Sequence, residues 1–180
     1  MNGEGMTRTE RNDLISLARR RARVAKQDAK VRAATLTAKV EEQLSAVFKS
    51  EDDRWNDARR RVQAEVEAMN QRIAAQLLAE GLPERLHPRA EMGWSGRGEN
   101  ARASRRAELR LLAKARINEQ LQTAVAEIER STVQLEADML AVTSGAEARN
   151  YLLGLPSAEA LLPSTVAETT VAELTGGSAQ

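Results

Sequence analysis

Apolar residues recur along much of this chain with the period of an α-helix. Between Thr7 and Glu80 there is neither glycine nor proline, and in the second half of this stretch apolar residues return every three or four positions. Such spacing places them on one helix face, where they form a coiled-coil-like seam. This seam comprises Val62, Val66, Met69, Ile73 and Leu77, with Trp55 one heptad before Val62.

The first half of the same stretch has a weaker pattern. Leu17, Val24 and Val31 recur every seven residues, but alanines and polar residues fill the positions between them. A seam this thin predicts a helix that buries little against a partner.

Capping signals set the limits of this helix at residues 7–80. Thr7 to Glu10 fits a capping box at the start, and Gly81 followed by Pro83 marks the end. Ser50 precedes three acidic residues and offers an internal cap. Two alternatives therefore stay open, a kink near residue 50 and one unbroken helix with an exposed acidic turn.

A connector rich in glycine and proline, residues 81–100, leads to a second helix at 101–143. The seam of this second helix is regular, with steps of three and four. Short helical turns are expected at 146–162, and a disordered tail at 163–180, where apolar residues are small or isolated. The main apolar positions of the second seam are Ile117, Leu121, Ile128, Leu135 and Met139.

These elements predict an all-α protein built as a long antiparallel helical hairpin. The second helix is expected to fold back over the second half of the first, leaving the first half as a projecting N-terminal basic arm. Residues 1–6 are expected to be a disordered start. Because a single hairpin buries little surface, the two seams predict a homo-oligomer.

Composition supports helices and excludes several kinds of chemistry. Only four of 180 residues are aromatic, so a large aromatic core is absent. There is no cysteine, which excludes disulfides and thiolate metal sites. No apolar run is long enough to cross a membrane, so no membrane partner is expected and a cytoplasmic location is the default.

The net charge of +1 hides a strong segregation of charge. Residues 1–40 hold ten Lys/Arg and four Asp/Glu, a net of +6, whereas residues 117–180 hold two and nine, a net of −7. Residues 102–116 add a second basic patch with a net of +5, six against one. The segregation favours either a bound polyanion or the pairing of opposite patches.

Nothing in the sequence assembles a catalytic, cofactor-binding or metal site. His87 is the only histidine and lies in the connector without a partner of catalytic type. The stretch from Gly93 to Asn100 is rich in glycine, but it lacks the glycine order and the preceding strand of a nucleotide loop. It is interpreted as the tip of the hairpin, with Trp94 as a plug, and the protein is not expected to be an enzyme.

The basic patches supply the candidate binding residues. Arginines near a helix start suit phosphate or carboxylate groups, and a basic helix can neutralise several phosphates without reading sequence. The alternative is that these cations pair with acidic residues of neighbouring helices or subunits. The candidate polyanion-binding residues are Arg19, Arg20, Arg21, Arg23, Lys26, Arg97, Arg102, Arg105 and Arg106.

Three stretches carry a resemblance to a known family. They are Thr9 to Leu14, Gly93 to Ala101 with its Gly-Trp-Ser-Gly-Arg-Gly-Glu-Asn core, and Arg105 to Arg110. Over most of residues 7–162 the chain resembles small helical proteins encoded by tailed phages and prophages of actinobacteria. The resemblance implies a phage setting and contributes no catalytic residues.

Two hypotheses for the function follow. The first is a non-enzymatic structural or interaction protein of phage particle assembly, which acts in the host cytoplasm or on the virion and binds other copies or other phage structural proteins. The second is a nucleic-acid-binding protein that uses the basic arm without sequence specificity. Neither hypothesis requires a cofactor.

Overall fold

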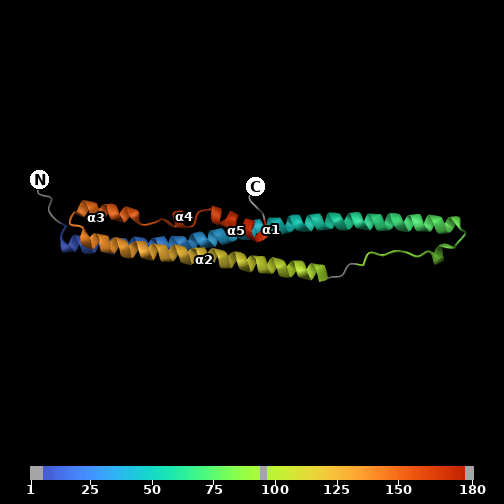
Figure 1. The fold of residues 1–180 in the computed structure, drawn as a ribbon, viewed down its shortest axis with the longest axis horizontal. Helices are drawn as coiled ribbons and strands as arrows, with labels where there is room; N and C mark the ends of the chain where they lie inside the picture. The colour runs from blue at the N-terminus through green and yellow to red at the C-terminus, as the bar shows by residue number, and fades with distance from the viewer. Residues whose placement is uncertain (1–5, 94–96, 177–180) are drawn as a thin grey trace. The chain divides into compact units, whose positions relative to one another are not determined.

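The computed structural model describes residues 6–93 and 97–176, and all regular structure within these ranges is helical (Figure 1). The all-α prediction is therefore confirmed. The elements, in chain order, are α1 (Arg8–Ala79), η1 (Glu84–Leu86), α2 (Arg97–Ala141), α3 (Gly145–Tyr151), η2 (Leu152–Gly154), α4 (Ala158–Leu161) and α5 (Thr165–Thr175).

Helix α1 is continuous through residue 50, and hydrogen bonds define both of its ends. At its start the hydroxyl of Thr7 accepts from the Glu10 amide at 3.2 Å, and the Thr7 amide donates to Glu10 Oε2 at 2.8 Å. These two bonds form the reciprocal pair of a capping box. At its end Gly81 adopts φ 78°, and the amides of Gly81 and Leu82 donate to the carbonyls of Leu78 and Leu77. A residue with a Cβ would be strained in this left-handed stop.

Helix α2 begins at Arg97, four residues before the predicted start. Gly98 and Asn100, which the prediction places in the connector, lie inside the helix. Glu99 stands in the first turn, where a carboxylate is stabilised by the free amides and the helix dipole. Trp94, predicted to plug the connector, lies outside the described residues.

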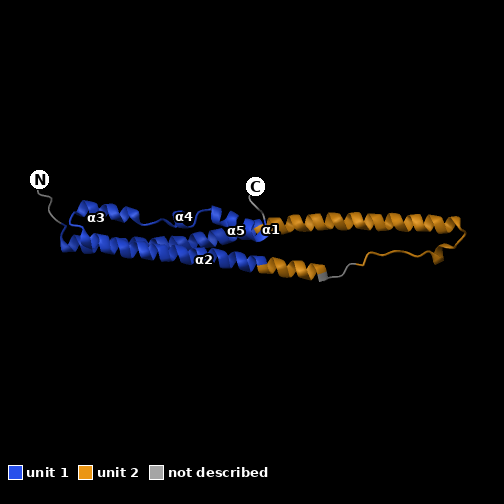
Figure 2. Ribbon diagram, viewed as in Figure 1, with its two compact units in different colours: residues 1–43, 109–180 blue, residues 44–108 orange. Residues whose placement is uncertain are grey.

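The chain divides into two compact units, which are considered separately (Figure 2). Unit 1 comprises residues 1–43 and 109–180, and unit 2 comprises residues 44–108. Each long helix contributes one part to each unit.

Unit 1 is a bundle of three helical layers (Figure 1). The N-terminal part of α1 runs antiparallel to the C-terminal part of α2, as the pairs Arg19–Glu136 and Lys26–Glu129 show. The chain then turns and runs back along α1 as α3, η2, α4 and α5. Lys39, further along α1, accordingly pairs with Glu168 in α5.

Alanine forms most of the buried face that α1 contributes to unit 1. Ala18, Ala22, Ala29 and Ala33 are at most 5% exposed and recur at helical spacing, followed by Leu36 and Val40. From α2 come Ala113, Ile117, Ala124, Ile128, Leu135 and Met139, and from the third layer Ala148, Leu152, Ala158, Leu162 and Ala167. Small side chains on α1 allow larger ones on the facing helices to fill the core.

This packing overturns the prediction of a projecting basic arm. The early heptad of Leu17, Val24 and Val31 is exposed by 37%, 56% and 58%, so it is not the packing seam. The alanine face is buried in its place, because alanine lets other helices lie close to the α1 backbone. The first half of α1 is thus enclosed on one side within unit 1.

The predicted disordered tail is also wrong over residues 165–175. These residues form α5, which buries Ala167 and Thr170. The hydroxyl of Thr170 donates to the Val166 carbonyl at 2.7 Å, so a polar side chain is buried with its donor satisfied. The sequence of this segment contains few large apolar residues, but small apolar side chains are enough to pack against an alanine-rich neighbouring helix.

Unit 2 contains the rest of α1, the connector and the start of α2. The first turns of α2 pair with α1 near Asp52, not with its end as predicted. The connector explains the shift: an extended residue spans roughly 3.3 Å whereas a helical residue rises about 1.5 Å, so a short connector runs back along many helical residues. The seam from Val62 to Leu77 therefore meets the connector and not a second helix.

Candidate functional site

The described residues contain no metal-binding arrangement and no spanning helix. No group of three or more His, Cys, Asp or Glu side chains in residues 6–93 and 97–176 is placed to hold a metal ion. Over the same ranges no helix has the length and apolar character needed to cross a membrane. The candidate sites are therefore the basic segments, the groove under the connector and the exposed apolar faces.

In unit 1 much of the basic segment is bound to the acidic end of the same chain. Arg19 donates twice to Glu136 at 2.8 Å, and Lys26 Nζ lies 2.6 Å from Glu129 Oε1. The hydrogen bonds from Arg19 hold the pKa of Glu136 below its usual value. Arg19 and Lys26 are seven residues apart, as are Glu129 and Glu136, so both pairs form in one antiparallel register.

Arginines of α1 also bind the backbone at the ends of the third-layer helices. Arg21 donates to the Leu152 carbonyl at 3.3 Å, and Arg32 donates to the Leu162 carbonyl and to the Ser164 hydroxyl. Carbonyls at a helix end lack partners within the helix, and a guanidinium satisfies them while it complements the helix dipole. Arg21 is therefore a structural residue, although the sequence made it a candidate for polyanion binding.

A smaller set of cations in unit 1 remains on the surface. Arg20, Arg23 and Lys30 are exposed, and none makes a hydrogen bond or ion pair with a described residue. They occupy positions i, i+3 and i+10 on α1, which lie on one side of a helix. Only Arg20 and Arg23 belong to the predicted candidates, and Lys30 joins them on this side.

In unit 2 the arginines at the start of α2 turn towards α1. Both terminal nitrogens of Arg106 bind Asp52, at 2.9 and 2.7 Å, and one also donates to the Phe48 carbonyl at 3.1 Å. Arg102 lies over the ring of Trp55, with 4.7 Å from its guanidinium carbon to the ring centroid. The hydrogen bonds from Arg106 lower the pKa of Asp52. The alternative of intramolecular pairing thus holds for Arg102 and Arg106.

Arg105 and Arg97 complete the predicted set. Arg105 is exposed and makes no hydrogen bond or ion pair with the part of the chain that the structure describes. The side chain of Arg97 lies outside the described residues. Within unit 2 the structure therefore brings Arg102 and Arg106 together at Asp52.

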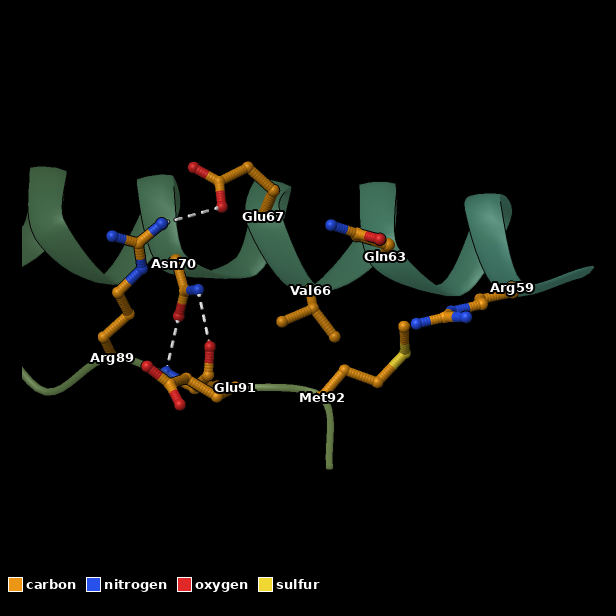
Figure 3. Close-up of a pocket in the computed structure, with 9 residues that line it drawn as sticks. Arg59, Gln63, Val66, Glu67, Asn70, Arg89, Glu91 and Met92 are labelled. Carbon is orange, nitrogen blue, oxygen red and sulfur yellow. Dashed lines mark hydrogen bonds and ion pairs between the residues drawn. The ribbon is translucent and has the colours of Figure 1, made fainter. Parts of the chain in front are cut away.

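The connector forms a groove with α1 in unit 2 (Figure 3). The Asn70 amide donates to the Ala90 carbonyl at 2.9 Å, and the Ala90 amide donates to the Asn70 side-chain oxygen at 2.8 Å. Met92 extends its side chain towards Arg59 beside these bonds, and Arg89 lies 3.4 Å from Glu67. The groove holds charges of both signs and no pair of nucleophile and base, so it resembles a packing contact more than a catalytic site.

Asn70 was not identified from the sequence, where it is one polar position in a helix. A side-chain amide that donates to the carbonyl and accepts from the N–H of one residue acts as a clamp on an extended chain. His87 has a similar local role, because its Nε2 lies 3.1 Å from the Leu82 carbonyl within the connector. No signal in the sequence alone distinguishes these two residues from solvated ones.

The predicted seams differ in their surroundings. On α2 the seam lies in the core of unit 1: Ile117, Ile128, Leu135 and Met139 are buried, and Leu121 is half-buried. On α1 in unit 2 the seam is open, with Trp55 exposed by 41%, Val62 by 49% and Met69 by 37%, while Val66, Ile73 and Leu77 are half-buried.

Comparison with known proteins adds no further identification. No family model, no curated protein and no solved structure matches the chain.

Proposed function

We propose that the chain is a non-enzymatic structural protein that self-associates through the open face of α1 in unit 2. The observation that carries this proposal is the row of Trp55, Val62 and Met69, three large apolar side chains that are each more than a third exposed. Exposed apolar side chains aligned on one helix face favour contact with a partner helix. A second helix on this face would complete a seam that the connector covers only in part.

Sedimentation or light scattering of the full chain at tens of micromolar tests this proposal. A mass that is a multiple of 19.7 kDa and falls on dilution is expected. Replacing Val62 by glutamate places a charge in the contact and should shift the protein to monomer, whereas the same change at Gln71 should have no effect because position 71 faces away from the seam. A monomer at all these concentrations would refute self-association.

The setting that best fits this role is the assembly of a tailed phage particle. The support is the resemblance of the three stretches in residues 9–14, 93–101 and 105–110 to phage-encoded helical proteins. The protein would then bind other copies or phage structural proteins in the host cytoplasm, and could remain with the virion. Neighbouring terminase, portal or capsid genes, and recovery of the chain with purified particles, would support this setting; neighbouring replication genes would count against it.

Nucleic-acid binding is the second candidate, favoured by one observation in unit 1. Arg20, Arg23 and Lys30 share one exposed side of α1 and have no bonding partner among the described residues. A salt titration with duplex and single-stranded DNA tests it, since binding through phosphates weakens steeply as salt rises. Reversing these three charges should abolish binding. Arg19 is unsuitable for this test because it is bound to Glu136 within the fold.

A further inference from the structure

The open face of α1 in unit 2 has a stripe with a strict seven-residue repeat. Trp55, Val62 and Met69, here called the apolar stripe, are exposed by 41%, 49% and 37%. Seven residues are slightly less than two helical turns, so successive members lie almost in line along the helix. A straight partner helix could contact Val62 and Met69 along this line, while the ring of Trp55 is partly covered by Arg102.

The two edges of the apolar stripe are unlike. On one edge the connector is already bound, through the two hydrogen bonds between Asn70 and Ala90, and Met92 and Val66 line the groove beside them (Figure 3). The other edge carries Ala58, Glu65 and Arg72, which also repeat every seven residues and are exposed. A partner helix must therefore approach over the edge with Ala58, which we call the open edge.

The open edge carries one negative and one positive charge. Neither Glu65 nor Arg72 makes a hydrogen bond or ion pair with any described residue. The small side chain of Ala58 permits close approach of a second backbone next to them. The edge thus has a defined charge order along the helix, negative and then positive.

This charge order is complementary to itself only when the second helix is reversed. In an antiparallel pair the two open edges meet, and a two-fold axis near Met69 brings Glu65 of each copy opposite Arg72 of the other. Two equal ion pairs then flank the apolar contact. In a parallel pair the open edge of one helix faces the opposite edge of its partner, which is the edge where the connector is bound to Asn70.

The same axis sets the apolar contacts. Met69 of one copy lies at about the level of Met69 of the other. Val62 lies six to seven residues from the axis, close to the level of Ile73 of the second copy. Trp55 lies near the end of α1 of the second copy, which stops at Ala79. The contact is therefore apolar around Val62 and Met69 and charged at its open edge.

We propose that two copies of this chain pair antiparallel through the apolar stripe, with reciprocal ion pairs between Glu65 of one copy and Arg72 of the other. This inference rests on the self-association proposed above and adds its orientation and its register.

The absence of cysteine makes the orientation directly measurable. In the full chain, Met69→Cys and Val62→Cys each introduce the only thiol. An antiparallel pair brings the two residues 69 close together but separates the two residues 62 by about 13 helical rises, roughly 20 Å, far beyond the roughly 4–7 Å between Cα atoms that a disulfide spans. Mild oxidation should therefore link Met69→Cys into a covalent dimer and leave Val62→Cys unlinked.

The outcomes separate this inference from the proposed function. If Val62→Cys links as readily as Met69→Cys, the pair is parallel and the inference is wrong. If neither variant links while the chain sediments as an oligomer, the proposed orientation and register are wrong, so the inference fails and self-association stands. If the chain is monomeric, both fail.

Charge exchange tests the register independently. Glu65→Arg and Arg72→Glu should each place like charges opposite one another twice per dimer and weaken association by roughly ten-fold or more. The double variant restores opposite charges and should recover the affinity of the original chain. Gln71→Glu, on the far side of the helix, is the control. Additive weakening in the double variant would overturn the register.

Discussion

Enlarging Ala18 to leucine tests whether the alanine face of α1 is a packed contact. Ala18 is fully buried in a cluster with Leu135 and Met139 of α2, Ala148 of α3 and Leu152. Three helical layers meet at this one methyl group. Leucine adds three carbon atoms where no space is open to solvent, so its neighbours must move or take unfavourable rotamers.

The expected cost follows from this geometry. Overpacking a well-filled site destabilises by about 1–3 kcal/mol. In a chain of this size each kcal/mol lowers the unfolding temperature by roughly 2–4 °C, so Ala18→Leu should lower it by about 2–12 °C. At Ala34, which is exposed on the same helix, leucine should change the stability by less than about 0.5 kcal/mol, since the two residues have similar helix propensities.

Thermal and urea unfolding, followed by circular dichroism, measure the difference between the two variants. Adding Leu135→Ala to Ala18→Leu exchanges the volumes of two clustered residues, and the double variant should be more stable than the sum of the two single effects predicts. If Ala18→Leu is as stable as Ala34→Leu, the alanine face is not closely packed and the three-layer bundle of unit 1 is refuted at this position.

Two further predictions concern polar contacts. Because Arg19 lowers the pKa of Glu136, the pair stabilises the folded state above the ordinary carboxyl range of about 4–4.5, and this contribution is lost as the pH falls below it. The unfolding temperature should thus drop between pH 6 and pH 3, and drop less in Glu136→Gln, which carries no titrating group; an equal drop in both would contradict the role of this pair. Asn70→Ala removes both bonds to Ala90, so amide exchange in residues 89–93 should accelerate while unit 1 stays unchanged, and unaltered exchange there would show that the clamp is unimportant.

The apolar pattern of α2 could be read from the sequence because its side chains are large. Ile117, Ile128 and Met139 recur at helical spacing and nothing else on that helix competes with them. On α1 the same search for large apolar residues at helical spacing selects Val24 and Val31 as the packing face, because alanine contributes little to a hydrophobic pattern. The face that packs was missed because close approach, not side-chain size, decides which side of this helix is buried.

Charge order was visible in the sequence but its partner was not. The excess of basic residues before residue 40 and of acidic residues after 117 predicts pairing of opposite patches, within or between chains. Only the antiparallel register shows that Lys26 meets Glu129 of the same chain. The sequence gives no such indication for Asn70. Its partner Ala90 lies in an irregular segment, and no periodic pattern predicts the path of that segment.

Unit 1 is assembled from the two ends of the chain, and this sets the time at which it can form. During synthesis Arg19 and Lys26 emerge before their partners Glu136 and Glu129, which lie 117 and 103 residues further along the chain. At about 5–20 residues per second, a ribosome needs on the order of 5–20 s to supply them. During that interval the alanine face has nothing to pack against, and a chain released before α2 and α5 are complete cannot close the bundle. Folding of unit 1 is therefore tied to the synthesis of the residues from 109 onward.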